Sequence, residues 1–376
     1  MSIIETKEKM KTIQSVLLEF LEDESNAEEN SENFFKLVSE YHLTEDKYKF
    51  KSILRLINAI ANNHQRVPNF IFKVERILGQ MKQNLQNYFS NSEIFEIFKD
   101  NKRILLFLIE EKLITIDKYI FSLITSYEFQ SKNYAEYFFP EIKPFLTKEN
   151  IEKYQNENPK LREISEEFYD KRKEGENDSY LCELIRKNQV KEFGVYVNRN
   201  NISLESYIEK SIFETNQLLL ENINNKMIEY ASFYGSIDII RYMRFNGNVE
   251  LTSNMWNYAV HSCNAELIRY LEDNHVSPIM NNYDRILKES IKCHHNEVSK
   301  YIIDYLMKEE DLQDDIENNY IDNFYMYAVE SHNYCFFPTN MHYKCMFLFL
   351  CEFDYYTLVR LYLSEGNIDV NAAIRH

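Results

Sequence analysis

The stretch YASFYGSIDIIRYM at residues 230–243 aligns without a gap on YAVHSCNAELIRYL at residues 258–271, and ESIKCHHNEVSKYI at residues 289–302 follows in the same register. A unit that recurs at a nearly fixed period is the signature of a stacked repeat protein. Each unit of such an array contributes surface to one extended face and not side chains to one closed pocket. The sequence therefore favours a binding protein over an enzyme.

Each unit has the pattern of two short helices joined by a tight turn. Gly235 is predicted to end the first helix of its unit, because the residue after a helix end is commonly left-handed and glycine adopts that conformation freely. The tripeptide at residues 246–248, Asn-Gly-Asn, closes the second helix. Residues at helical spacing define the buried faces of the two helices: Ile228, Ala231, Ser232, Ile239, Ile240 and Met243.

Small and large residues recur at matching positions of the units. Ala231, Ala259 and Ala328, three of only ten alanines, occupy the same point of the first helix. A small side chain there lets neighbouring units approach closely. Trp256, the only tryptophan, takes an apolar slot near the start of its first helix, and Leu287 takes the same slot one unit later.

The composition predicts an all-α protein. The 376 residues include only six glycines and six prolines, so the turn residues that many short strands require are scarce. Hydrophobic residues make up 44% of the chain, which is enough to bury a substantial core. Helical stretches are expected at residues 2–21, 31–40, 44–61 and 69–89, followed by three short helices between residues 92 and 126.

A break in the apolar pattern predicts two domains. Three prolines between residues 140 and 159 precede the charged stretch 162–178. We therefore expect a boundary near Gly175, with an N-terminal helical region at residues 1–175 and a repeat domain at residues 176–376. The paired short helices of the N-terminal region already look like divergent solenoid repeats.

The charge and the termini limit the classes of partner. A formal net charge of −17 argues against nucleic acids and anionic membranes, since both attract clustered Lys and Arg. The N-terminal segment MSIIETKEKMKTIQ is charged and lacks the apolar core of a signal peptide. The longest apolar run, residues 345–351, is far shorter than the ~18 residues of a membrane span. We expect a cytoplasmic protein whose six cysteines are reduced thiols.

The repeated unit resembles the ankyrin repeat. The second-helix pattern of that family is a glycine, an acidic residue, two aliphatic residues, a basic residue and further aliphatic residues, and GSIDIIRYM at residues 235–243 matches it. The stretch LVRLYLSEGNIDVN at residues 358–371 looks like the end of another ankyrin unit, with its glycine turn at Gly366. The resemblance implies a right-handed α-solenoid of helix-turn-helix repeats. The repeats are degenerate, since the Thr-Pro-Leu-His opening of typical ankyrin units is absent.

Four segments carry a narrower resemblance: LCELIRKNQVKEFGVYVNRNNISL (181–204), SIFETN (211–216), IEYASFYGSIDIIRYM (228–243) and MWNYAVHSCNAELIRYLE (255–272). They are similar to the ankyrin-like domain of unknown function that precedes ankyrin arrays in many trichomonad-type protist proteins. This resemblance implies an interaction module and supplies no catalytic residues.

The sequence lacks the motifs of common enzyme classes. Its six glycines never cluster, so neither a phosphate-binding loop nor a dinucleotide fingerprint is present. It contains neither the Gly-x-Ser-x-Gly elbow of serine hydrolases nor the His-Glu-x-x-His helix of zinc proteases. We therefore expect no catalytic residues, no cofactor and no small-molecule substrate.

One group of residues has the side chains of a metal site. Cys and His pairs bind zinc, and stacking of units brings the ends of neighbouring first helices together. The spacing is not that of a zinc module, and turn positions in a solenoid are commonly polar. We interpret these residues as solvent-exposed turn residues and expect no metal: His261, Cys263, Cys293, His294 and His295.

The predicted function is a non-catalytic scaffold that binds a protein partner through the concave face of its repeats. Exposed aromatic and charged side chains on the first helices would anchor that partner. The candidate partner-binding residues are Tyr230, Phe233, Tyr234, Tyr258, His261, Ser262, Glu289 and Lys292, extended by loop tips at 250–254 and 277–282. The alternatives are a structural protein that self-assembles through its helices, and an enzyme with an unrecognised site.

Overall fold

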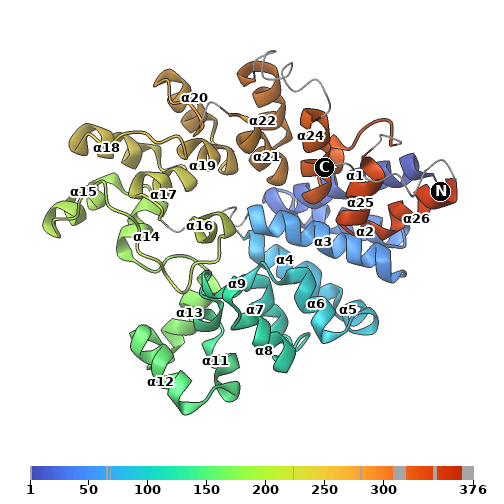
Figure 1. Cartoon of the computed structure of the whole chain (residues 1–376), viewed down its shortest axis with the longest axis horizontal. Helices are drawn as coiled ribbons and strands as arrows, with labels where there is room; N and C mark the ends of the chain where they lie inside the picture. The colour runs from blue at the N-terminus through green and yellow to red at the C-terminus, as the bar shows by residue number, and fades with distance from the viewer. Residues whose placement is uncertain are drawn as a thin grey trace. The chain divides into compact units, whose positions relative to one another are not determined.

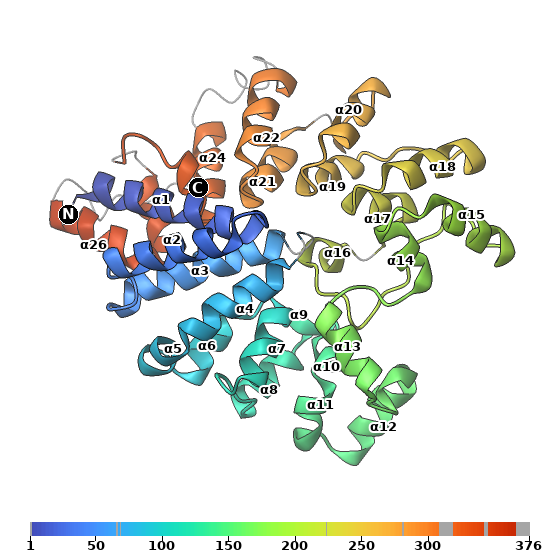
Figure 2. The same ribbon diagram turned by 180° about the vertical axis from the view of Figure 1, so that it is seen from behind.

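The structure is a computed structural model, which describes residues 2–64, 67, 69–222, 224–279, 282–307, 319–341 and 345–365. Within these residues the protein is all-α, which confirms the prediction of an all-α protein, and most of its helices are short (Figures 1 and 2). No β-strand occurs among them, and the isolated antiparallel bridge that they contain pairs Tyr207 with Lys226. None of their helices has both the length and the apolar character needed to cross a bilayer.

The chain forms two compact units. The first unit combines Met1–Val74 with Met280–His376, and the second unit is Glu75–Ile279. The boundary predicted near Gly175 lies inside the second unit, so the compact units divide the chain at other places. Gly366, in the predicted last turn, lies outside the described residues.

The first unit joins the two ends of the sequence. Its helices are α1 (Ile3–Glu22), α2 (Ala27–Glu40), α3 (Lys47–Asn63), α21 (Asp284–Lys292), α22 (Asn296–Tyr301), the π-helical turn η4 (Ile302–Leu306), α24 (Asn319–Glu330), the 3-10 turn η5 (Tyr334–Phe336), α25 (Met346–Glu352) and α26 (Tyr356–Glu365). α1 packs on α2, η5 and α26, and α26 also packs on α3. N- and C-terminal helices therefore share one core.

The second unit is continuous in sequence, and α4 (Phe70–Gln80) crosses into it from the first unit. Its helices are α5 (Lys82–Tyr88), α6 (Asn91–Phe98), α7 (Lys102–Glu110), α8 (Lys118–Ile124), α9 (Tyr127–Gln130), α10 (Tyr134–Tyr137), α11 (Phe139–Ile142), η1 (Lys143–Phe145), α12 (Lys148–Glu157), η2 (Pro159–Leu161), α13 (Glu166–Glu174), α14 (Tyr180–Arg186), α15 (Val190–Arg199), α16 (Gln217–Glu221), α17 (Met227–Phe233), α18 (Ile237–Gly247), α19 (Met255–His261) and α20 (Ala265–Asp273).

Local sequence sets where many of these helices begin. Ser2 caps α1 by accepting a hydrogen bond from the Glu5 amide at 3.2 Å, and Ser90 with Glu93 forms a complete capping box on α6. Helices α1, α2 and α3 match the predicted stretches within a few residues. The stretch expected at 69–89 divides into α4 and α5.

The charged stretch 162–178 contributes to the core of the second unit, whereas the sequence predicted a domain boundary within it. Arg172 of α13 is almost fully buried and makes a two-pronged ion pair with Glu141, with N–O distances of 2.7 and 2.8 Å. It also donates to the Tyr137 carbonyl at 3.1 Å. An apolar cluster joins this stretch to the segments before and after it: Phe139, Leu161, Phe168, Ile212 and Phe213. Paired charges and scattered aromatics thus hold together a segment without helical apolar periodicity.

Candidate interaction surface

Six helix pairs turn through the same backbone motif. In the second unit, Gly235 between α17 and α18 has a φ of +66°, which confirms the predicted left-handed conformation at this glycine. Its amide donates to the Ser232 carbonyl at 3.0 Å, and the next amide, from Ser236, donates to the Ala231 carbonyl at 2.8 Å. This is a Schellman motif, which pairs carbonyls that a helix end leaves unsatisfied. The left-handed residues of the six turns are Asn188, Gly235 and Cys263 in the second unit, and His294, His332 and Asp354 in the first unit.

In three of the six turns, the side chain of the residue after the left-handed position links its helix pair to the preceding pair. In the second unit, the Ser236 hydroxyl donates to the Ile185 carbonyl at 2.5 Å. In the first unit, the Asn333 amide donates to the Ile291 carbonyl at 3.0 Å, and the Tyr355 hydroxyl donates to the Val329 carbonyl at 2.7 Å. The acceptor is at the same place each time, three residues before the left-handed residue of the preceding pair. These bonds fix neighbouring pairs in register.

The pairs of the second unit stack through their first helices. α14 packs on α17, α17 packs on α19, and α15 packs on α18 (Figures 1 and 2). Ala231 and Ala259 are fully buried where these helices meet, and Trp256 is buried with its indole N–H donating to the Val276 carbonyl at 2.7 Å. These matching positions of the aligned sequence units are therefore all buried.

The predicted partner-binding residues of the second unit lie in the interior. Every residue of α17 and α19 is buried, and Tyr230 and Tyr258 are each only 2% exposed. The Tyr230 hydroxyl accepts a hydrogen bond from Arg186 at 3.1 Å, and the Tyr258 hydroxyl donates to Asn225 at 2.7 Å. Phe233 is buried as well. The expectation that these side chains point away from the core is wrong, because their rings fill the space between helices.

The remaining candidates are buried or half-buried. His261 is buried and stacks on Phe233 with 5.1 Å between ring centroids, while Tyr234 and Ser262 are half-buried. In the first unit, Glu289 is buried and forms an ion pair with the half-buried Lys292 at 3.7 Å. Of the predicted loop tips, Glu250 is exposed and Asn254 is half-buried, while residues 280 and 281 lie outside the described part of the chain.

The predicted turn residues of the Cys and His group differ in exposure. Cys263 is exposed at its turn, as expected, but Cys293 and His294 are buried, which corrects the expectation of solvent exposure. The Cys293 thiol lies 3.5 Å from the Glu289 carboxylate. Burial lowers the pKa of His294 to about 3, so the ring is neutral. All six cysteines are free thiols in the structure.

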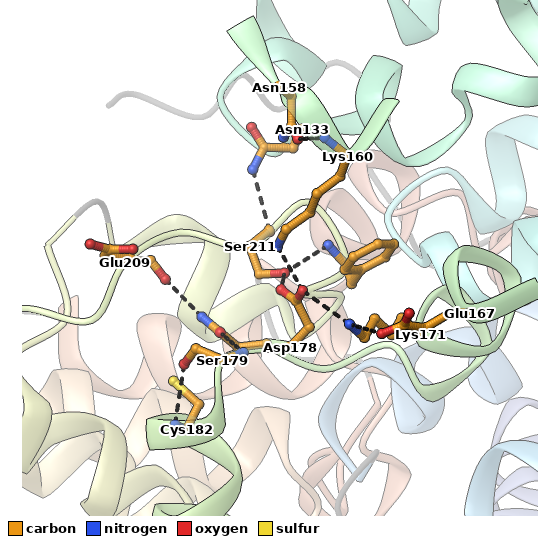
Figure 3. Close-up of polar contacts among 12 residues, drawn as sticks. Asn133, Asn158, Lys160, Glu167, Lys171, Asp178, Ser179, Cys182, Glu209 and Ser211 are labelled. Atoms are coloured by element: carbon orange, nitrogen blue, oxygen red, sulfur yellow. Dashed lines mark hydrogen bonds and ion pairs between the residues drawn. The ribbon is translucent and has the colours of Figure 1, made fainter. Parts of the chain in front are cut away.

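The half-buried carboxylate of Asp178 holds the first helix pair of the second unit, α14 and α15, against the segments before it. Asp178 accepts hydrogen bonds from Lys160 at 2.6 Å and from Ser211 at 2.7 Å, and forms a longer ion pair with Lys171 at 3.8 Å (Figure 3). Burial raises the pKa of Asp178, but the hydrogen bonds from Lys160 and Ser211 outweigh burial and hold the pKa below its ordinary value. The carboxylate is therefore a charged anchor for three segments.

The residues on either side of Asp178 lead into the first helix pair, α14 and α15. Asn177 donates to the Glu209 carbonyl at 2.7 Å, and the Ser179 hydroxyl caps α14 by accepting from the Cys182 amide at 3.2 Å (Figure 3). The start of the repeats is thereby fixed to the rest of the second unit. Sequence reasoning missed this network because its members are far apart in the chain.

In the second unit, the second helix of each pair carries most of the exposed side chains. We call this surface the outer face and define it by exposed residues of α15, α18 and α20: Lys191, Val195, Asp238, Arg241, Phe245, Glu266 and Arg269. Arg241 bridges α18 to α20 through an ion pair with Glu266 at 2.8 Å. Phe245 is 90% exposed and Val195 is 68% exposed. The outer face thus combines exposed apolar side chains with arginines.

Comparisons with known proteins give no relative for this chain. Family models, curated proteins and solved structures each yield no match. The resemblance to ankyrin proteins therefore stays a prediction.

Proposed function

We propose that this chain is a non-catalytic scaffold that binds a protein partner, and that its helix pairs form a degenerate, ankyrin-like right-handed solenoid. The repeated turn and the hydrogen bonds between successive pairs support this proposal, because a rigid array presents side chains at fixed spacing. The buried first helices leave the outer face of the second unit as the surface for the partner. A cytoplasmic location, as the sequence predicts, is part of this proposal.

Phe245 is the observation that carries the proposed surface. A phenylalanine that is 90% exposed gains no stability from burial within the chain, while aromatic and arginine side chains are the common anchors of interfaces. Arg269 lies on the neighbouring helix α20, is exposed, and makes no hydrogen bond or ion pair with any residue that the structure describes. The partner that fits is a protein with an apolar pocket beside a carboxylate.

The most perturbed amine of the second unit also favours a non-catalytic role. Burial lowers the pKa of Lys102 to about 7, which is a value suited to proton transfer. However, its side chain is fully buried, its ammonium donates to the Glu214 carbonyl at 2.8 Å, and it lies over the rings of Tyr134 and Tyr137. No substrate reaches this amine without unfolding its surroundings. Its partners give it a structural role.

The test is capture of partners by the intact chain from lysate of its own cells, followed by mass spectrometry. Phe245→Ser combined with Arg269→Ser should weaken capture of a specific protein by roughly thirtyfold, since loss of one hot spot costs about 2 kcal/mol or more. Tyr127→Ser is the matched control, because Tyr127 is also 90% exposed and lies in the same unit, on α9. The control should retain the same protein.

Three results would speak against the proposal. Equal capture by the double variant and the wild type places the surface elsewhere, and absence of any specific protein contradicts a scaffold. Light scattering addresses self-assembly: a wild-type oligomer that the double variant loses would make the outer face a contact between copies of this chain.

A further inference from the structure

The first unit contains a pocket that the proposed scaffold function does not use. It has a volume of about 200 Å³ and lies between α1, the end of α2, α3, η5 and the start of α26. All of its walls belong to the first unit. It is therefore separate from the outer face of the second unit.

The floor of the pocket is apolar and built on the core. Met10, Ile13, Leu43, Tyr334, Tyr355 and Leu358 line it, and all six side chains are buried. The rings of Tyr334 and Tyr355 meet edge to face with centroids 6.1 Å apart. The Tyr355 hydroxyl donates to the Val329 carbonyl, which fixes the orientation of this ring in the wall.

The size of the pocket fits one ring. An apolar cavity of about 150 Å³ accommodates benzene in a protein interior, so a pocket of about 200 Å³ has room for a six-membered ring with a short substituent. Aromatic walls favour an aromatic occupant through edge-to-face contacts.

The rim carries an amine that is available to a ligand. Lys49 of α3 is half-buried at the rim, and its ammonium makes no hydrogen bond or ion pair with any residue in the described part of the chain. Lys9, also on the rim, lies over the Tyr41 ring and forms an ion pair with Glu5 at 3.2 Å. Glu40 supplies the one rim carboxylate. A carboxylate on the ligand pairs with the Lys49 ammonium next to the apolar floor.

We propose that this pocket binds a small monocyclic aromatic carboxylate. The ring occupies the space between α1, Tyr334 and Tyr355, and the carboxylate pairs with Lys49. This inference departs from the expectation, drawn from the sequence, that the protein takes no small molecule. The sequence does not show the pocket because its walls come from the two ends of the chain.

The test is calorimetric titration of the intact protein with phenylacetate and with its neutral analogue, phenylacetamide. Wild-type protein should bind phenylacetate at least about tenfold more tightly than the amide, as expected for a charge-assisted hydrogen bond. Lys49→Gln should remove that preference and leave amide binding unchanged. Thr357→Phe, at a half-buried rim position on α26, should fill the pocket and abolish binding of both compounds.

Lys36→Gln is the matched control, because Lys36 is exposed on α2 of the same unit and lies outside the pocket. It should bind both compounds as the wild type does, and circular dichroism should show that all variants are folded. The proposal is overturned if neither compound binds at millimolar concentration, if acid and amide bind equally, or if Thr357→Phe leaves binding intact. Binding of an acidic, aromatic peptide in place of the free acid would also overturn it, since the occupant would then be a protein segment.

Discussion

The Ser236 hydroxyl donates a 2.5 Å hydrogen bond to the Ile185 carbonyl, which lies near the end of the preceding first helix, α14. Ser236 is buried, so neither partner has water as a ready substitute. Asn333 and Ile291 repeat this relationship in the first unit. The same kind of hydrogen bond therefore connects successive helix pairs in both units.

Ser236→Ala should lower the free energy of unfolding by about 0.5–1.5 kcal/mol, because a buried hydrogen bond is lost while the Ile185 carbonyl still accepts from the Asn188 amide. Urea unfolding measures the change. Ser262→Ala is the control: the Ser262 hydroxyl is half-buried and donates within its own helix, to Ala259. Equal stability of Ser236→Ala and wild type would show that the bond does not join the pairs.

Ala259→Leu should destabilise the protein by about 1–3 kcal/mol, because Ala259 is fully buried where α17 meets α19 and additional methylenes overpack such a contact. Thermal and urea unfolding measure the loss. Ala265→Leu, at an exposed position on α20, supplies a change of the same size without the contact and should be nearly neutral. If Ala259→Leu leaves the free energy of unfolding unchanged, the contact between α17 and α19 is not tightly packed.

Tyr258→Ala should cost about 3–5 kcal/mol, as large aromatic deletions in a core do. Tyr258→Phe separates the hydroxyl from the ring and should cost less, through loss of the hydrogen bond to Asn225. Tyr180→Ala removes a half-exposed tyrosine of α14 and should cost little. An unchanged melting temperature in Tyr258→Ala would restore the prediction, made from the sequence, that this ring faces solvent.

Stability should fall as the pH falls below about 6.5. Burial lowers the pKa of both His294 and His332 to about 3, so the folded protein keeps the rings neutral while the unfolded chain protonates them. The unfolded state therefore binds more protons between about pH 3 and pH 6.5. At pH 5 each ring should cost roughly 2 kcal/mol relative to pH 7.5.

Urea unfolding at the two pH values measures this dependence. His332→Asn should reduce the difference, and Asn suits the left-handed backbone at that position. His275→Asn is the control, since His275 is also left-handed but exposed, and it should leave the difference unchanged. A pH difference that His332→Asn does not alter would place the responsible groups elsewhere.

The left-handed conformation of the turn residue was predicted from the sequence at one turn and not at the others. Gly235 is left-handed as expected, and Asn248 ends α18 in the same conformation. Cys263 adopts that conformation too, although a cysteine gives no local signal for it. There the hydrogen bonds of the turn and the packing of the helix pair outweigh the intrinsic preference of the residue.

Many of the helices, and the register of the aligned units, follow from local sequence. The spacing of apolar residues and the matching alanines Ala231 and Ala259 depend on the 3.6-residue period of a helix, which is a local property of the chain. Which helix faces are covered, and which segments share a core, is set by tertiary packing. Tyr230 is buried and Phe245 is exposed. Segments from the first and last parts of the sequence share the first unit. These outcomes depend on which surfaces meet after segments far apart in the chain come together. No periodicity within a single helix contains that information.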